Sequence, residues 1–554
     1  MKTYGIVLAF PPGLSLRGHG LSVHLVRLME GMLDAPDTRI VIACPGWMAS
    51  SLRQHLEESF VDLGRVRILC TETPYAIRFL EWRRRPRARL GGWRTWVKRL
   101  VDSAWPGPSL QRTRARLLEA RMPAELASAA FSALLIAPRL AAAALMAIAC
   151  RSGMWALRTT RSAARTAARR TGLSRAAGAL RQLVRDPRQA SWVLEDYERL
   201  HAGELVRLGN LMKEQRQVEA WLCPTAFWPA LCRLDLPLLV IVPDITPMEH
   251  AVGFTAPSRA MQGSLVRTVE HVVATAKLAR RIVTYSEAVR DRTLGERLGI
   301  DPGRVLVIPH GTTDLAPLIR VHEPDGTEAD SSDFCRGLLG AALGRAIHRR
   351  TPIREGGREW RFILYPTQFR PNKNVIGLVD AYELLLRRHL VPEKLLLTGS
   401  QKELLDHVKA RGLQEEVVIL PDLTDQELAA AYRVASLAVS PTLAEGACPF
   451  MVAEALSVGT PVLCSDIPVT REVVRDPALR EAMCFDPYDR EDMASRMLWA
   501  LRNRATLQQL QLPLWQHMSA RTWSVAAREY RHALDETARA WHASRAGSAH
   551  GGPS

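Results

Sequence analysis

Two glutamates, Glu445 and Glu454, lie on either side of a predicted helix start within residues 442–461, TLAEGACPFMVAEALSVGTP. The helix is expected to begin near Pro449, because proline suits a first helical position. A helix N-terminus presents free N–H groups and about half a positive charge, which suits an anion such as phosphate. The residues expected to line this anion site are Gly446, Ala447 and Cys448. Carboxylates beside it point to a ligand that also carries sugar hydroxyls. An isolated glutamate pair is equally typical of a solvated loop and helix face.

Cationic residues occupy a second segment, YPTQFRPNKNV at residues 365–375. It follows a predicted strand and opens the next helix, so its side chains are expected at the sheet edge that also carries the glutamates. Arg370 and Lys373, with Gln368 beside them, would neutralise negative charge on a bound phosphate group. A basic turn at a helix entry is the plain alternative.

Weaker candidates follow other predicted strands. Glycine near a strand end lets the backbone approach a ligand, although it is more often only a turn. These candidates are Gly18 and Gly20 before the first helix, Asp244 and Ser286 at the ends of the predicted strands LPLLVIVPD and RRIVTYSE, and Gly399 and Ser400 at the end of KLLLTGS.

The elements that position these residues alternate between strand and helix. Short apolar runs such as YGIVLAF, RIVIACP and RFILYP indicate buried parallel strands, and the segments between them have helical periodicity. Thr424 and Glu427 form an S/T-x-x-E capping box that predicts a helix start. The pattern predicts an α/β fold of two Rossmann-like, doubly wound domains that face each other across a cleft.

The domain boundaries follow from changes in this pattern. The helix expected over residues 524–540 lies beyond the second sheet. The predicted parts are an N-terminal Rossmann-like domain (1–74 and 191–311), a basic helical insertion (75–190), an inter-domain connection (312–359), a C-terminal Rossmann-like domain (360–520), and a helix with a disordered tail (521–554).

The segment at residues 442–461 resembles the E-G-x-x-x-P…E-A-L/M…G-T-P-V signature of glycosyltransferase family four, whose members have the GT-B fold. The resemblance implies that Glu445 contacts the donor sugar and that Glu454 contacts the nucleotide ribose. It also implies that Lys373 binds the donor diphosphate. Gly399 and Ser400 match the strand end where the family packs the nucleotide.

Three departures from the family pattern stand out. Eight residues separate the two glutamates where the family has seven. Gln368 occupies the position of the family arginine, and Arg370 could supply the lost charge. Pro243 replaces the family histidine before Asp244, and that role is either empty or falls to His250. No clustered Asp or His motif suggests a metal, in line with the metal-independent members of the family.

The basic insertion accounts for the high isoelectric point. Residues 75–190 carry 24 Arg and Lys against 5 Asp and Glu, a net charge of +19, while the whole chain has +17. Tryptophans interleaved with arginines suit an anionic membrane surface, and the apolar runs are too short to span a bilayer. A solvated helical insertion and a polyanion-binding segment are the alternatives. No motif for specific nucleic-acid binding accompanies the arginines.

The resemblance to family four implies a retaining hexosyltransferase with a nucleoside-diphosphate sugar as co-substrate and no further cofactor. GDP-mannose is the first candidate donor, and a lipid-linked or growing glycan of bacterial surface polysaccharide is the acceptor. We expect a cytoplasmic protein, peripheral on the inner face of the membrane. Nine cysteines without a CxxC pair fit a reducing compartment. The alternatives are a non-catalytic, membrane-associated GT-B scaffold, and an enzyme that hydrolyses or isomerises the nucleotide sugar.

Overall fold

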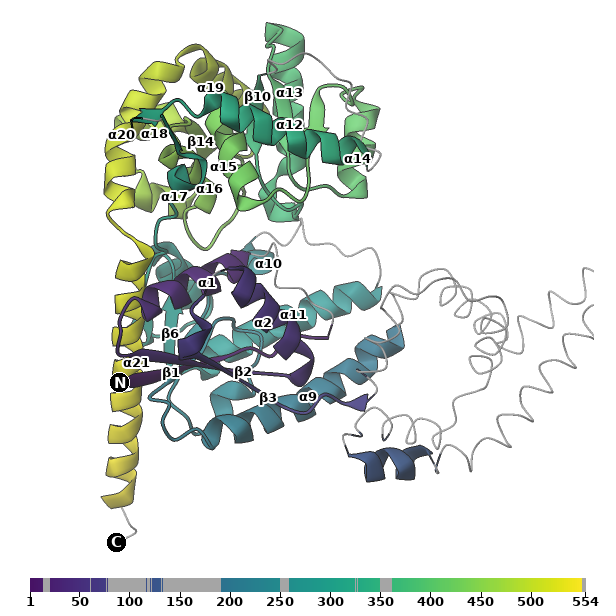
Figure 1. Ribbon diagram of the computed structural model, residues 1–554, viewed down its shortest axis with the longest axis vertical. Coiled ribbons are helices and arrows are strands. Elements are labelled where there is room, and N and C mark those ends of the chain that lie inside the picture. The colour runs from purple at the N-terminus through teal and green to yellow at the C-terminus, as the bar shows by residue number, and fades with distance from the viewer. Residues whose placement is uncertain are drawn as a thin grey trace, which may run out of the picture. The chain divides into compact units, whose positions relative to one another are not determined.

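A computed structural model of the protein contains two parallel β-sheets covered by helices (Figure 1), which confirms the predicted α/β, GT-B-like fold. The structure describes residues 1–12, 20–59, 61–75, 77, 116, 120, 122–130, 132, 191–249, 259–323, 325, 327–348 and 361–550. Most of the predicted insertion at residues 75–190 lies outside these residues, as do Gly18 and His250.

The first sheet has seven strands in the order β3-β2-β1-β4-β5-β6-β7. Its strands are β1 (Lys2–Val7), β2 (Thr38–Cys44), β3 (Val66–Cys70), β4 (Trp221–Cys223), β5 (Leu238–Ile241), β6 (Arg281–Thr284) and β7 (Val305–Val307). The sheet is flanked in sequence by α1 (Gly20–Leu33), α2 (Gly46–Glu58), α9 (Ser191–Lys213), α10 (Thr246–Glu249) and α11 (Arg259–Leu278). The strand β4 was not predicted, because three residues are too few to show a period. It pairs in parallel with β1 and β5.

The second sheet has six strands in the order β12-β11-β10-β13-β14-β15, all paired in parallel. Its strands are β10 (Phe362–Tyr365), β11 (Lys394–Leu397), β12 (Val417–Ile419), β13 (Leu437–Ser440), β14 (Val462–Ser465) and β15 (Cys484–Phe485). Its helices are α13 (Val375–His389), α14 (Lys402–Ala410), α15 (Asp425–Val434), α16 (Phe450–Ser457), α17 (Pro468–Val473), α18 (Pro477–Met483), α19 (Arg490–Arg502) and α20 (Arg504–Ser519). The chain reverses its direction of winding between β10 and β13, and a doubly wound sheet binds ligands at such a switch point.

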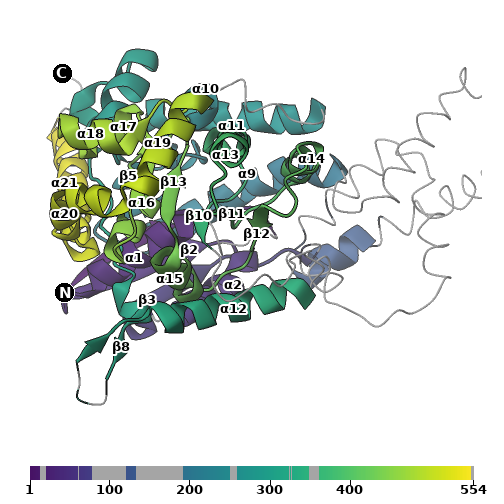
Figure 2. The ribbon, with the colours of Figure 1, turned by 90° about the horizontal axis from the view of Figure 1, so that it is seen from above.

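The segment between the two sheets is not a plain connection. It contains a hairpin of β8 (Val321–His322) and β9 (Glu328–Ala329), followed by α12 (Ser332–His348), both visible in Figure 2. The helix α12 packs against α15, and its Cys335 and Leu339 join the core of the second sheet. These contacts place α12 in the C-terminal domain.

The last helix returns to the first sheet. The helix α21 (Trp523–His550) packs along α1 and β5 (Figure 1), where we expected it to lie beyond the second sheet. It buries Tyr530 and Leu534 and continues ten residues past the end predicted at Ala540. A helix from the C-terminal end of the chain therefore packs on the N-terminal domain.

The chain divides into two compact units. The first comprises Met1–Ile6, His19–Ile40 and Val218–Ser554, and so contains the whole second sheet. The second comprises Val7–Gly18 and Val41–Gln217. Within the second unit, the indole Nε1 of Trp47 donates to the carbonyl of Phe10 at 2.9 Å.

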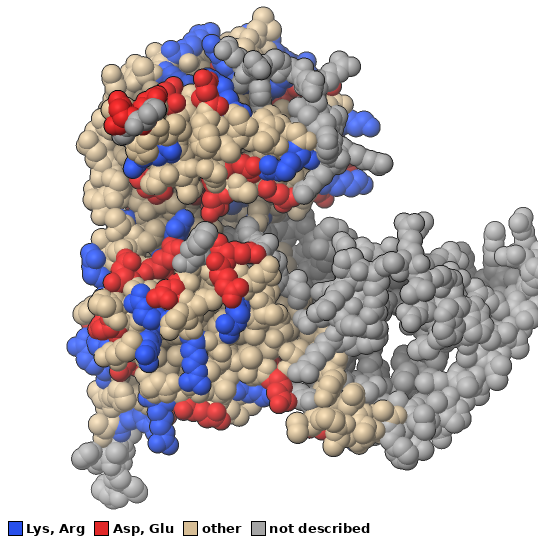
Figure 3. Space-filling model, in the orientation of Figure 1, with Lys and Arg blue, Asp and Glu red and all other residues tan. Residues whose placement is uncertain are grey.

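The described surface carries charges of both signs. On the face in Figure 3, Lys and Arg side chains are interspersed with Asp and Glu. This agrees with the sequence, in which the residues outside 75–190 are nearly neutral in sum. Over the part of the chain that the structure describes, no helix combines the length and apolar character that a bilayer span requires.

Candidate functional site

The predicted site centres on an ion pair between Lys373 and Glu445. The Nζ atom of Lys373 donates to Oε1 of Glu445, and the two side chains are 24% and 16% exposed. The hydroxyl of Thr442 donates to the same carboxylate oxygen at 2.8 Å. The structure thus brings together a cation and a carboxylate from the loops after β10 and β13, the two strands at the switch point.

Backbone hydrogen bonds fix these two loops to each other. The carbonyl of Asn372 accepts from the Leu443 N–H at 2.7 Å and from the Thr442 hydroxyl at 3.0 Å. The buried amide of Asn372 donates to the carbonyl of Ala444 at 3.0 Å. Next to Lys373, Asn374 adopts a left-handed conformation with φ 51° and is the N-cap residue of α13, which begins at Val375. The loop geometry is therefore set by the backbone and side chain of Asn372 together with the left-handed backbone of Asn374.

Glu454 lies in α16 and is held by one hydrogen bond. The hydroxyl of Tyr432, on α15, donates to its Oε2 at 2.8 Å. Burial raises the pKa of Glu454, and the hydrogen bond from Tyr432 partly offsets this. The helix begins at Phe450 with Pro449 as its N-cap residue, one position earlier than the first helical position predicted for this proline.

Gly446, which was predicted to line the anion site, lies close to protein backbone. A Cβ atom added to Gly446 would lie 2.0 Å from the carbonyl oxygen of Pro243. The buried hydroxyl of Ser286 donates to the Gly446 carbonyl at 2.9 Å. Pro243 and Ser286 follow strands of the first sheet. The loop between β13 and α16 (residues 441–449, the donor loop) therefore contacts the N-terminal domain directly. In this structure the space beside Gly446 is occupied by Pro243.

A second contact between the two domains was not predicted. The carboxylate of Glu472, on α17, accepts from the backbone N–H groups of Glu287 at 3.0 Å and Ala288 at 2.6 Å. These residues precede the π-helix η5 (Val289–Arg297) of the N-terminal domain. Glu472 therefore caps a helix of the other domain, and a single sequence offers no signal for such a cap.

The remaining predicted residues have local roles. Arg370 is exposed and donates to Oε1 of Gln368 at 3.1 Å. A Cβ atom on Gly399 would lie 2.3 Å from the Thr367 carbonyl oxygen, so this glycine lets two loops pack. The neighbouring Ser400 is exposed.

In the N-terminal domain, Asp244 accepts from the backbone N–H of Thr246 at 3.0 Å and so initiates α10. Gly20 is the first residue of α1. Burial raises the pKa of the Cys448 thiol, near Glu445, to about 12 and keeps it neutral.

A buried histidine pair, His24 and His310, lies beside the start of α16. The Nδ1 atoms of His24 and His310 are 3.1 Å apart, and the His310 ring lies 4.6 Å from that of Phe450 between ring centroids. Burial lowers the pKa of both imidazoles, that of His24 to about 3. Both rings are therefore neutral, and Trp523 at the start of α21 packs against them.

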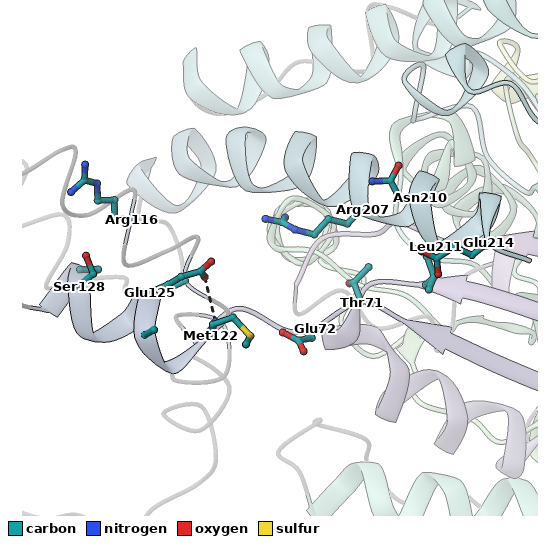
Figure 4. A pocket seen from close by; sticks show the side chains of 13 residues that line it. Thr71, Glu72, Arg116, Met122, Glu125, Ser128, Arg207, Asn210, Leu211 and Glu214 are labelled. Carbon is teal, nitrogen blue, oxygen red and sulfur yellow. Dashed lines mark hydrogen bonds between the residues drawn. The ribbon is translucent and has the colours of Figure 1, made fainter.

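Two cavities open on the described surface. One, of about 620 Å³, lies at the carboxyl ends of β14 and β15 and includes Leu443 of the donor loop. The other, of about 920 Å³, belongs to the second unit and is lined from α9 by Arg207 and Asn210 and from the opposite side by Glu72 and Glu125 (Figure 4). None of the predicted site residues lines this larger cavity. In the described part of the chain, no group of three or more His, Cys, Asp or Glu side chains is arranged to hold a metal ion.

Comparison with known proteins agrees with this geometry. Residues 351–511 match the family described as "Glycosyl transferases group 1". The O-antigen chain mannosyltransferase B of Escherichia coli is 31% identical over 146 residues, which cover 26% of this chain and 37% of that protein. The family match covers most of the C-terminal sheet domain, and the aligned segment spans little more than a third of the curated relative.

Solved structures resemble the chain over nearly its whole length. Sucrose-phosphate synthase from Thermosynechococcus elongatus has a TM-score of 0.53 at 13% identity, with 98% of this chain and 100% of that chain covered. Anabaena Alr3699/HepE in complex with UDP and glucose has a TM-score of 0.51 at 12% identity, with 96% and 99% covered. At these identities the likeness shows the GT-B fold alone.

Proposed function

We propose that the protein, which carries a group 1 glycosyl transferase domain on a GT-B fold, is a glycosyltransferase that moves a hexose from a nucleoside-diphosphate sugar to a glycan hydroxyl. The observation that carries this proposal is the pairing of Lys373 with Glu445 at the switch point of the second sheet. There a cation for a diphosphate and a carboxylate for sugar hydroxyls lie within one hydrogen bond of each other. A transferase of nucleotide sugars needs both groups at the two sides of the bond that breaks.

Each residue of the site has a proposed role. Lys373 holds the diphosphate and neutralises its charge as it leaves, and Arg370 approaches from the same loop. Glu445 orients the sugar, and Glu454 accepts a hydrogen bond from the ribose. The N–H groups at Ala447 and Cys448, before α16, assist at the phosphates. The transfer is proposed to retain anomeric configuration by front-face attack and to need no metal, as the resemblance to family four implies.

The proposed donor and acceptor are suggested by relatives, and the proposed location by the composition of residues 75–190. GDP-mannose is the first donor candidate, because the E. coli relative is an O-antigen chain mannosyltransferase. UDP sugars come next, because HepE was crystallised with UDP and glucose. The acceptor is proposed to be a lipid-linked or growing glycan of a bacterial surface polysaccharide. Residues 75–190 are proposed to bind an anionic membrane surface from the cytoplasmic side.

A non-catalytic scaffold is the second candidate. It is favoured by Gln368 and Pro243, which replace the expected arginine and histidine, and by the extra residue between the glutamates. Gly446, packed against Pro243, also leaves the donor loop covered in this structure. The intact Lys373–Glu445 pair favours the enzyme, since a degenerate site need not keep both.

Nucleotide binding tests the proposal. Thermal unfolding of the full chain would be followed with GDP, UDP, ADP and their common sugars. A ligand at 100 times its Kd stabilises the folded state by about 2.7 kcal/mol, which is readily measured. We expect one nucleotide to stabilise the wild type and to have little effect on Lys373→Ala. If no nucleotide stabilises the wild type, the transferase proposal is wrong and the scaffold becomes the better explanation.

A further inference from the structure

The cavity of about 620 Å³ at the carboxyl ends of β14 and β15 adjoins the proposed donor site. Leu443, two residues before Glu445 in the loop after β13, forms part of its wall. Pro487, which also lines the cavity, is joined to the loop that carries Lys373. The Asn374 side-chain amide donates to the carbonyl of Pro487 at 2.8 Å. The cavity and the donor site therefore share their supporting loops.

Guanidinium and carboxylate groups alternate along the cavity wall. Arg471 pairs with Asp466 at 2.7 Å, and Arg496 lies 3.5 Å from Asp492. The guanidinium group of Arg480, which is half-buried in the wall, has no hydrogen-bond or ion-pair partner among the described residues, while the Arg480 backbone N–H donates to the Asp476 carbonyl at 2.9 Å. Three arginines and four carboxylates line the cavity, so its charge is nearly balanced and does not favour a highly charged ligand.

An exposed aromatic ring completes the wall. Tyr488 is 68% exposed, although tyrosine usually buries its ring in a folded protein. The backbone N–H of Tyr488 is held by the Asp486 carboxylate at 2.9 Å, which fixes the turn that presents the side chain. A flat, exposed ring beside paired carboxylates and guanidinium groups suits a pyranose. The ring offers a face for the sugar C–H groups, while the charged groups accept from and donate to hydroxyls.

We propose that this cavity is a saccharide subsite that holds a sugar unit of the acceptor glycan, next to the unit that receives the hexose. This inference rests on the proposed transferase function. Tyr488 stacks on the pyranose, and Arg480 donates hydrogen bonds to its hydroxyls. The subsite lets the C-terminal domain, which binds the donor, also select acceptors longer than one sugar.

Binding of defined oligosaccharides tests the subsite. The probes are α-linked mannotetraose and α-linked glucotetraose, titrated into the full chain and followed by saturation-transfer difference NMR. The variants are Tyr488→Ala, Tyr488→Phe and Arg480→Ala. Phe334→Ala is the matched control, because Phe334 is also an exposed aromatic (42%) of the C-terminal domain but does not line the cavity. Each variant is also tested for nucleotide stabilisation, which reports on its fold and on the donor site.

We expect at least one tetrasaccharide to bind the wild type, and Tyr488→Ala to weaken that binding about tenfold, which corresponds to about 1.4 kcal/mol. Tyr488→Phe and Phe334→Ala should stay within about twofold of the wild type, since both keep an aromatic ring in the cavity. Arg480→Ala should weaken binding while nucleotide stabilisation is unchanged.

The subsite is refuted if a nucleotide stabilises the wild type but neither tetrasaccharide binds, or if binding does not respond to Tyr488→Ala and Arg480→Ala. Failure of nucleotides to stabilise the wild type would instead refute the transferase proposal. If tetrasaccharide binding still depended on Tyr488 in that case, the cavity would be a saccharide-binding site, but the proposal that it holds the acceptor of a transfer reaction would be wrong.

Discussion

Substitution of Lys373 by alanine separates the structural role of the Lys373–Glu445 pair from its role in binding. In the structure, Glu445 has two partners, the Lys373 ammonium and the Thr442 hydroxyl. Lys373→Ala leaves a carboxylate that is only 16% exposed with a single neutral hydrogen bond. The variant therefore removes a cation from the proposed diphosphate site and also leaves a half-buried charge unpaired.

The cost to stability can be bounded from the burial of the pair. Loss of one partner of a fully buried pair costs about 3–5 kcal/mol, whereas exposed pairs contribute about 0–1 kcal/mol. With 24% and 16% of the two side chains exposed, we expect roughly 1–3 kcal/mol of destabilisation. The double variant Lys373→Ala/Glu445→Gln should recover most of this loss, because a neutral amide needs no cation as a partner.

Nucleotide affinity should follow a different pattern. A charge-assisted contact with a diphosphate is worth about 1.5–3 kcal/mol, or about 10- to 150-fold in Kd. We expect this loss in Lys373→Ala and also in the double variant, whereas Glu445→Gln alone should keep affinity for the free nucleoside diphosphate. Isothermal titration calorimetry with the nucleotide that stabilises the wild type measures all four proteins.

Two results would refute this reasoning. If Lys373→Ala binds the nucleotide with the affinity of the wild type, Lys373 does not contact the diphosphate. If the double variant regains both stability and affinity, the loss in Lys373→Ala came from the distorted loop around Glu445.

Three further predictions concern the contacts that join the domains and the buried histidines. Glu472→Ala loses two charge-assisted hydrogen bonds to backbone N–H groups, so the radius of gyration from small-angle X-ray scattering should increase, while Glu472→Gln should change it less. Gly446→Ala places a methyl group 2.0 Å from the Pro243 carbonyl oxygen and should lower the thermal midpoint by the equivalent of about 1–3 kcal/mol; an unchanged midpoint would show that the loop is free to move. Burial lowers the pKa of His24 and His310, so the unfolded chain binds more protons. Stability should be constant above about pH 6.5 and decrease as the pH falls below it towards the folded pKa, and His24→Leu should reduce this dependence in urea titrations.

Local patterns in the sequence predicted much of the fold. The predicted capping box is present, because Glu427 N–H donates to the Thr424 hydroxyl at 3.2 Å and Thr424 N–H donates to the Glu427 carboxylate at 3.0 Å. The strands after which Lys373 and Glu445 lie were also predicted, since buried parallel strands form continuous apolar runs. Both patterns are local: each predicts the conformation of the same few residues that form it.

Relations between distant segments were not predictable from one chain. The packing of α12 on α15 was not predicted, and the return of α21 to the first sheet was placed wrongly. The close approach of Gly446 to the Pro243 carbonyl, 203 residues earlier in the chain, was not predicted. Glu472 was missed because the N–H groups that it caps belong to another domain. Each of these depends on tertiary contacts, for which sequence periodicity carries no information.

The return of α21 has a mechanical consequence for motion between the two sheet domains. The chain passes between the domains twice, near Thr312 and near Arg521, and the two crossings are joined by the hydrogen bond from the Thr312 N–H to the Arg521 carbonyl at 2.7 Å. Gly311 packs against the Trp523 backbone at the same place. Two joined crossings restrict twisting of one domain relative to the other more than a single linker does. Relative motion of the domains should therefore be hinge bending about one axis. The same arrangement means that the N-terminal domain cannot be separated by one cut in the chain, because its last helix would be lost.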